Sequence, residues 1–120
     1  MVKQTLVIGA SVKPERYSNK AIKKLQEHNI PTYAIGLRDG KIEHVTIDTD
    51  LMPYSEIHTV SLYVSAKNQT PYYDYIISLN PQRVIFNPGT ENPEFYTLLK
   101  EKKIDFEEAC TLVLLSTDVF

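Results

Sequence analysis

Apolar and polar positions form alternating blocks along this chain, and the first two blocks predict a strand followed by a helix. Residues 5–10 are a continuous, partly β-branched apolar run. Continuous rather than alternating hydrophobicity is typical of a strand buried on both faces of a parallel sheet. The apolar positions that follow have helical spacing and predict a helix over residues 17–28, for which Ser18 is the expected N-cap.

The same alternation repeats to the end of the chain. Further strands are predicted at residues 32–35, 57–64, 83–86 and 104–107, with a possible minor strand at 45–47. Two more helices are expected, one capped by Thr70 and one starting at Asn92-Pro93. The apolar tail, residues 111–120, is expected to dock on the body as a short helix or strand.

Strands that alternate with helices predict βαβ units, and therefore an α/β fold with a parallel sheet. We expect one three-layer Rossmann-like domain over residues 1–120, with a five-stranded, mostly parallel sheet in the order 3-2-1-4-5. Ligands of such sheets bind beyond the carboxyl ends of the strands. That edge, which we call the rim, is predicted to carry Gly9–Ser11, Gly36–Arg38, Tyr63–Lys67 and Asn87–Thr90.

Composition narrows the class of protein. The chain has 120 residues, 42% apolar and 23% charged, which suits a single globular domain and not a disordered chain. A net charge of −2 argues against a dedicated nucleic-acid binder. No apolar run approaches the roughly 20 residues of a membrane helix, and the single cysteine excludes an internal disulfide. We therefore expect a cytoplasmic protein with no nucleic-acid or membrane partner.

The first turn carries the clearest chemical signal. Gly9 follows a predicted strand and lets a ligand approach the backbone, while the helix N-terminus attracts anions. Ser11 adds a hydroxyl, and Lys13 and Arg16 add positive charge. The further glycines of the dinucleotide fingerprint are missing, because Ser11 and Pro14 stand at their positions. A tight turn with a surface lysine and arginine is the alternative interpretation.

The turn after the second strand offers a second cationic position. An NAD site has an acidic residue there, whereas this chain has Arg38. Arginine suits a ribose phosphate, so both NADP and coenzyme A fit, and a solvated turn arginine is the alternative. The later turn around Gly89 also permits close backbone approach, with capping as the other interpretation.

Other reactive side chains show no catalytic pattern. Cys110 is expected to be a small core residue, and the three histidines lie too far apart to suggest a metal site. No serine stands in a G-x-S-x-G elbow, and no catalytic residue is predicted. The tyrosines at 72, 73 and 75 are interpreted as a packed helix face, or alternatively as an interface, for example in a homodimer.

Taken in order, these motifs resemble a known family. Gly9-Ala10-Ser11-x-Lys13-Pro14-x-Arg16-Tyr17-Ser18 resembles the opening motif of the small stand-alone CoA-binding proteins. Those proteins are single Rossmann-like domains similar to the CoA-binding domain of the succinyl-CoA synthetase α subunit. The strand layout, the loop at 87–92 and the Cys110 segment extend the resemblance over almost the whole chain.

The resemblance implies a CoA-type ligand stretched over the strand ends. It implies that Gly9, Ala10 and Ser11 hold the pyrophosphate, and that Arg38 lies near the adenosine phosphate. With the rim positions, the expected ligand contacts are Gly9, Ala10, Ser11, Lys13, Arg16, Tyr17, Ser18, Gly36, Leu37, Arg38, Tyr63, Asn87, Pro88 and Gly89. The catalytic histidine of the synthetase belongs to a separate domain, so binding of CoA or acyl-CoA without catalysis is expected.

Two other functions stay open at this point. A small NADP-dependent oxidoreductase would need a proton donor at the rim, for which Tyr63 and Ser65 are the candidates. A regulatory or interaction subunit would dock through the tyrosine-rich helix or the apolar tail.

Overall fold

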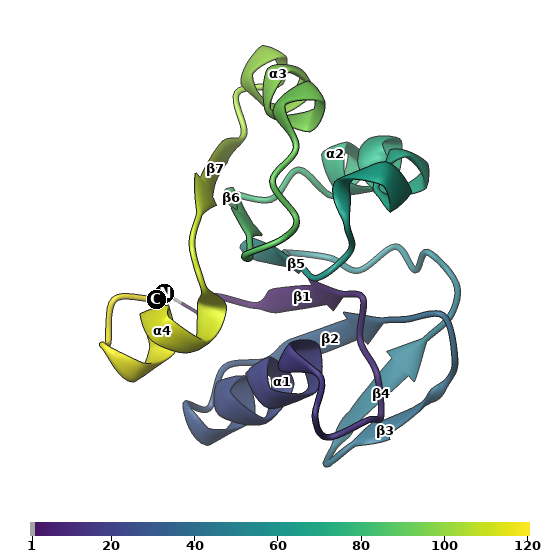
Figure 1. Cartoon of the computed structure of the whole chain (residues 1–120), viewed down its shortest axis with the longest axis vertical. Helices are drawn as coiled ribbons and strands as arrows, with labels where there is room; N and C mark the ends of the chain where they lie inside the picture. The colour runs from purple at the N-terminus through teal and green to yellow at the C-terminus, as the bar shows by residue number, and fades with distance from the viewer. Residues whose placement is uncertain (1) are drawn as a thin grey trace.

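One seven-stranded sheet, in the order β3-β4-β2-β1-β5-β6-β7, runs through the centre of the protein in a computed structural model that describes residues 2–120 (Figure 1). All pairings are parallel except β3 with β4. The strands are β1 (Thr5–Ile8), β2 (Thr32–Ile35), β3 (Gly40–Ile42), β4 (Val45–Asp48), β5 (Thr59–Leu62), β6 (Arg83–Phe86) and β7 (Asp105–Glu108).

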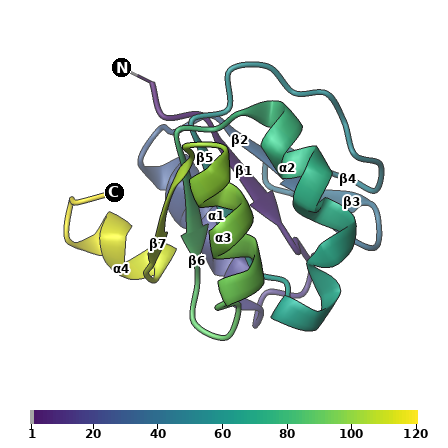
Figure 2. The same cartoon turned by 90° about the horizontal axis from the view of Figure 1, so that it is seen from above.

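Helices cover both faces of this sheet, so the predicted three-layer Rossmann-like α/β architecture is confirmed. α1 and α4 lie on one face, and α2 and α3 lie on the other (Figures 1 and 2). The helices are α1 (Tyr17–Glu27), α2 (Tyr73–Leu79), α3 (Pro93–Glu101) and α4 (Thr111–Ser116), and two 3-10 turns, η1 (Ala66–Asn68) and η2 (Thr70–Tyr72), precede α2. No helix among residues 2–120 combines the length and apolar character needed to cross a membrane.

The prediction of five strands in the order 3-2-1-4-5 is wrong. The segment expected as the third strand is β5, and it pairs directly with β1, with Thr5 opposite Thr59. The place beside β2 belongs to β4, where Ala34 is opposite Ile47. β4 confirms the possible minor strand expected at residues 45–47, and its hairpin with β3 turns at Glu43, which has a φ of 54°. Hairpin turns normally signal such a φ with glycine or asparagine, so the sequence does not indicate that β4 pairs with β3 in a hairpin.

The crossover from β4 to β5, residues 49–58, contains no helix. On this part of the sheet the rings of Tyr33 and Tyr54 pack with centroids 4.7 Å apart and planes tilted by 30°. The hydroxyl of Tyr54 donates to the carboxylate of Asp48, at the end of β4. A pair of aromatic rings therefore covers an area that a crossover helix would otherwise occupy.

Both expected helix caps, Ser18 and Thr70, are wrong, whereas the expected start of a helix at Asn92-Pro93 is confirmed. Arg16 is the N-cap of α1 without a side-chain hydrogen bond, and Ser18 is instead a buried residue of the first turn. Thr70 opens a 3-10 turn without capping it, and α2 starts only at Tyr73. At α3, Asn92 Oδ1 accepts a hydrogen bond from Phe95 N at 3.3 Å, as a capping asparagine does.

The core has two halves, one on each face of the sheet. The half beneath α2 and α3 combines aliphatic side chains with a group of aromatic rings, in which Tyr73 and Phe95 stack at 4.4 Å and Phe86 and Tyr96 pack edge to face at 4.6 Å. Tyr72 and Tyr75 pack partly against the same cluster, which confirms the packed tyrosine face of this helix. The other half, beneath α1 and α4, is mainly aliphatic and includes Ile22 and Leu115, with Phe120 as its one buried aromatic residue among residues 2–120.

Candidate functional site: the carboxyl-end rim

The parallel register brings the four predicted turns to one edge of the sheet. Ile8, the last residue of β1, lies opposite Ile35 and Leu62, which end β2 and β5. Leu62 in turn lies opposite Phe86, the end of β6. The strands of this part of the sheet point toward the lower edge in Figure 2, so the turns that follow them share that edge. The predicted rim therefore exists as a continuous line of turns.

Two glycines let these turns approach one another closely. Gly9 has a φ of 98°, and a Cβ on it would lie 2.8 Å from the carbonyl oxygen of Tyr63. A Cβ on Gly36 would lie 2.4 Å from the carbonyl oxygen of Ala10. Real Cβ atoms do not approach backbone oxygens so closely, so only glycine fits at either position. Gly9 and Gly36 thus bring three turns of the rim into contact.

The start of α1 presents free hydrogen-bond donors at this edge. The backbone N–H groups of Tyr17, Ser18 and Asn19 find no acceptor among residues 2–120, and no side chain caps the helix. Such unpaired donors, together with the helix dipole, favour a negatively charged ligand. The first turn of α1 therefore has the chemistry of an anion site.

Two cations lie in the turn that leads to these donors. Lys13 and Arg16, in the turn between β1 and α1, are both exposed. Within residues 2–120 neither side chain forms an ion pair with a carboxylate. The backbone nitrogen of Lys13 donates to Ser11 Oγ at 3.2 Å, which shapes the turn. Both cations are thus available to a bound anion.

The turn after β2 lies against the turn after β1. A Cβ on Gly40, at the start of β3, would lie 2.5 Å from the side chain of Val12. Because Arg38 is two residues before Gly40, its turn neighbours the anion turn. Leu37 beside it is 91% exposed. Val12 and Tyr17 are exposed as well, so apolar surface borders the cations.

Asn87, an expected ligand contact, forms hydrogen bonds inside the protein. Its side chain is 1% exposed. Asn87 Nδ2 donates to Ser61 Oγ at 2.9 Å and to the Leu62 carbonyl at 2.8 Å, and Asn87 Oδ1 accepts from Thr111 N at 2.8 Å. The neighbouring Pro88 and Gly89 are exposed at the rim.

The backbone of Tyr63 lies at the rim, but its hydroxyl does not. The Tyr63 hydroxyl is buried and has no hydrogen-bond partner among residues 2–120. Burial raises the pKa of Tyr63 to about 12, although the nearby hydroxyls of Thr111 and Ser61 act in the opposite direction. Those two hydroxyls bond to each other at 2.8 Å. A buried phenol with so high a pKa is a poor proton donor for a substrate at the rim.

Cys110, expected in the core, is partly exposed and stands at the N-cap of α4. Within residues 2–120, no three histidine, cysteine, aspartate or glutamate side chains are grouped as metal ligands.

One side chain at this site was not predicted from the sequence. Asn19, on the first turn of α1, is 2% exposed. Asn19 Nδ2 donates to the carbonyl oxygen of Ser11 at 2.9 Å, whereas its Oδ1 has no partner among residues 2–120. An unpaired buried acceptor costs about 1–3 kcal/mol. The available signal was its spacing, because Asn19 stands three residues before the core residue Ile22 and therefore on the buried face of the helix.

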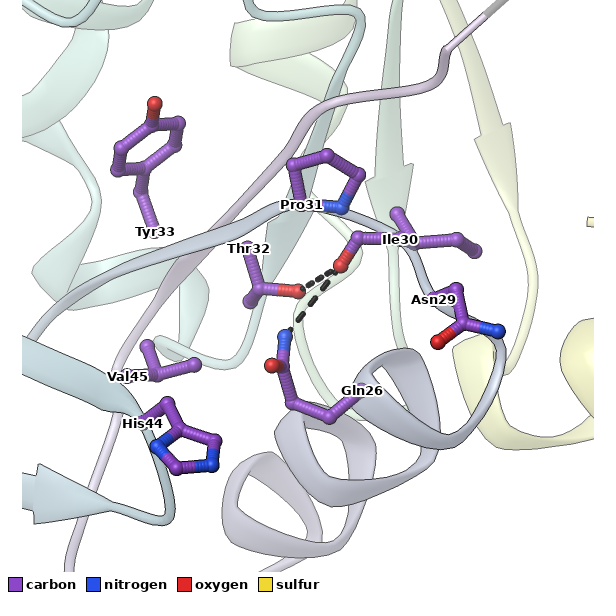
Figure 3. A pocket seen from close by; sticks show the side chains of 8 residues that line it. All are labelled: Gln26, Asn29, Ile30, Pro31, Thr32, Tyr33, His44 and Val45. Carbon is purple, nitrogen blue, oxygen red and sulfur yellow. Dashed lines mark hydrogen bonds between the residues drawn. The ribbon is translucent and has the colours of Figure 1, made fainter.

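A separate hollow of about 400 Å³ lies at the opposite end of β2 (Figure 3). Its lining includes Gln26, Thr32, Tyr33 and His44. The side chains of Gln26 and Thr32 both donate to the Ile30 carbonyl, at 3.3 and 2.8 Å. These donors are satisfied locally, and the hollow is far from the anion turn along the strand direction.

Comparisons with known proteins agree with this architecture. An uncharacterized protein of known crystal structure superposes with a TM-score of 0.96 and 39% identity, covering 100% of this chain and 99% of that one. A Thermus thermophilus protein, cell-free ID.343, has a TM-score of 0.87 at 19% identity, covering 99% of this chain and 91% of its own. A hypothetical protein from Pyrococcus horikoshii OT3 has a TM-score of 0.87 at 24% identity, covering 97% and 83%.

No curated protein matches the chain. The model of the CoA binding domain family matches residues 3–116, which is nearly the whole sequence and includes every turn of the rim. The resemblance inferred from the motifs is thereby confirmed, and the chain belongs to the CoA binding domain family.

Proposed function

We propose that this protein binds coenzyme A or an acyl-CoA at the rim and catalyses no reaction of its own. The observation that carries the proposal is the uncapped N-terminus of α1, whose free N–H groups lie beside the unpaired cations Lys13 and Arg16. Three features of this edge match three parts of a CoA molecule. The free donors suit the pyrophosphate, Arg38 suits the ribose phosphate, and the exposed apolar surface at Leu37 suits the adenine ring.

Binding of NADP is the competing proposal, because Arg38 suits either ribose phosphate. Turnover of NADP also needs a group that exchanges a proton with the substrate. Of the two candidates, Tyr63 has a buried hydroxyl with a raised pKa, whereas Ser65 is exposed. An unperturbed serine hydroxyl is a weak acid at neutral pH, so the residues favour binding over redox chemistry.

Calorimetric titration of the purified protein with CoA, acetyl-CoA and NADPH tests the proposal. We expect saturable binding of CoA and acetyl-CoA, and weaker binding of NADPH. Bound ligand should also raise the free energy of unfolding, by about 2.7 kcal/mol at a ligand concentration one hundred times the Kd. Absence of any heat or thermal shift with millimolar CoA contradicts the proposal, and preferential NADPH binding with turnover supports the oxidoreductase instead.

The double variant Lys13→Ala/Arg16→Ala should lose most of the affinity for CoA. Lys100→Ala/Lys103→Ala is a matched control, because it removes two exposed lysines from the opposite end of the sheet, near the start of β7. Both variants change the net charge by the same amount. A difference between them therefore reports the position of the cations rather than the overall charge.

A further inference from the structure

Asn19 connects the first turn of α1 to the turn that precedes it. Its Nδ2 donates to the Ser11 carbonyl at 2.9 Å, across eight residues of sequence. Ser11 in turn accepts a hydrogen bond from Lys13 N through its hydroxyl. The Asn19 amide is thus linked through Ser11 to the backbone of Lys13, one of the two unpaired cations.

The side-chain oxygen of Asn19, Oδ1, shows that favourable packing alone does not explain why an asparagine stands at this buried position. The side chain is 2% exposed, and Oδ1 has no partner among residues 2–120. An apolar side chain of similar size would have no unpaired buried acceptor. The unpaired Oδ1 of Asn19 therefore lowers the stability of the folded protein. Its single hydrogen bond within the described chain goes to the anion turn. Unfavourable buried groups of this kind are expected where a site needs a fixed geometry.

We infer that Asn19 is a positioning residue for the anion turn. It holds the Ser11 carbonyl, and so keeps residues 11–16 in the conformation that presents the α1 N–H groups, Lys13 and Arg16 to a phosphate. This inference rests on the proposed function for its ligand, but the ordering of the turn is a property of the protein alone. Preorganisation of this kind raises affinity because the turn need not be ordered when the ligand binds.

Asn19→Leu is the decisive variant, since leucine is close to asparagine in size and lacks both amide atoms. Gln26→Leu is a matched control on the same helix, where Gln26 Nε2 donates to the Ile30 carbonyl at 3.3 Å. Each variant replaces one side-chain amide and removes one hydrogen bond to a backbone carbonyl. Only the first removes a contact to the anion turn.

Two measurements on each protein test the inference. The first is the ¹⁵N order parameter of the backbone amides of Lys13, Glu15 and Arg16 without ligand. We expect values near about 0.85 in the unchanged protein and in Gln26→Leu, falling below about 0.6 in Asn19→Leu. The second is the Kd for CoA, measured well below the unfolding temperature, which we expect to rise at least about tenfold only in Asn19→Leu.

The outcomes separate this inference from the proposed function. If the unchanged protein does not bind CoA, the proposed function fails, and the order parameters still decide the role of Asn19. Retention of both turn order and affinity in Asn19→Leu overturns the inference, even if that variant is less stable. Should Asn19→Leu not fold, Asn19→Ala makes the same deletion with a smaller side chain, and the same two readouts apply.

Discussion

The backbone nitrogen of Thr111 donates a hydrogen bond to Asn87 Oδ1 at 2.8 Å, across 24 residues of sequence. The same asparagine donates to Ser61 Oγ and to the Leu62 carbonyl. One buried amide therefore joins the ends of β5 and β6 to the first residue of α4.

Replacing Asn87 with alanine should destabilise the protein strongly. The change removes the buried hydrogen bonds that Asn87 makes to the Leu62 carbonyl and the Thr111 N–H, so we expect a loss of about 3 kcal/mol in the free energy of unfolding. Urea denaturation measures it. Asn68→Ala is the control, because that exposed amide donates only to the nearby Ser65 hydroxyl, and it should change stability by less than about 0.5 kcal/mol.

Alanine substitutions at three glycines should destabilise the protein to different extents, because the space around each glycine differs. Gly36→Ala and Gly9→Ala would drive Cβ into the backbone oxygens of Ala10 and Tyr63, so we expect each to cost more than about 3 kcal/mol. Gly89 has a φ of 93°, but nothing lies within 4 Å of its Cβ position, so only backbone strain of about 1–2 kcal/mol is expected. Thermal unfolding of the three variants gives the order, and equal effects at Gly36 and Gly89 would contradict it.

Arg38→Ala should weaken CoA binding selectively. If Arg38 contacts the 3′-phosphate, its removal raises the Kd for CoA by about three- to tenfold and leaves the Kd for dephospho-CoA unchanged. Calorimetry with both ligands measures the difference. Lys103→Ala, an exposed lysine distant from the rim, serves as the charge-matched control. An equal effect of Arg38→Ala on both ligands would place the arginine elsewhere on the ligand.

Phe120 should contribute to stability although it follows the last helix. Its ring lies 4.4 Å from the Arg83 guanidinium, its carbonyl oxygen accepts hydrogen bonds from Arg83 and Lys3, and the residue is 9% exposed. We expect Phe120→Ala to lower the free energy of unfolding by about 2–4 kcal/mol. The adjacent Val119 is exposed, so Val119→Ala should have little effect in the same chemical denaturation experiment.

His58 should make stability depend on pH below about 6.5. Desolvation, with Arg83 and Lys3 nearby, lowers the pKa of His58 from its ordinary value of 6.5. The unfolded chain therefore binds more protons than the native protein at pH values between the lowered pKa and about 6.5. Stability should fall as the pH is lowered through this window. His58→Gln should remove this component of the pH dependence, whereas His44→Gln, at an exposed position, should retain it.

The positions of many strands and helices were predictable because the two kinds of element have different patterns of apolar residues. The continuous apolar run at residues 5–8 and the Asn92-Pro93 cap are strong local signals, and both elements formed as expected. The strand order was not predictable in the same way, because the hairpin of β3 and β4 turns at Glu43, which gives no glycine signal, and nothing local shows that β4 takes the place beside β2. Pairing between distant segments is decided by the whole sheet rather than by local sequence.

At the candidate site, the position of the turns was predictable and the direction of individual side chains was not. The rim turns follow from topology, since parallel strands place their carboxyl ends together. The direction of individual side chains does not follow from it. Asn87 and Tyr63 occupy predicted rim positions, yet the Asn87 amide and the Tyr63 hydroxyl are buried. Asn19 was missed because a polar residue in the first turn of a helix is usually solvent-exposed.

The edge strand β7 has a consequence for how copies of this protein can meet. It carries Asp105, Glu107 and Glu108 in four residues, all exposed. Two copies that joined their sheets along this edge would bring six carboxylates together, and among residues 2–120 only Glu107 of these forms an ion pair, with Arg83 at 3.8 Å. Charge of one sign on an unpaired strand is a common protection against such continuation. If the protein forms a homodimer, the two copies should therefore associate through a surface other than the β7 edge.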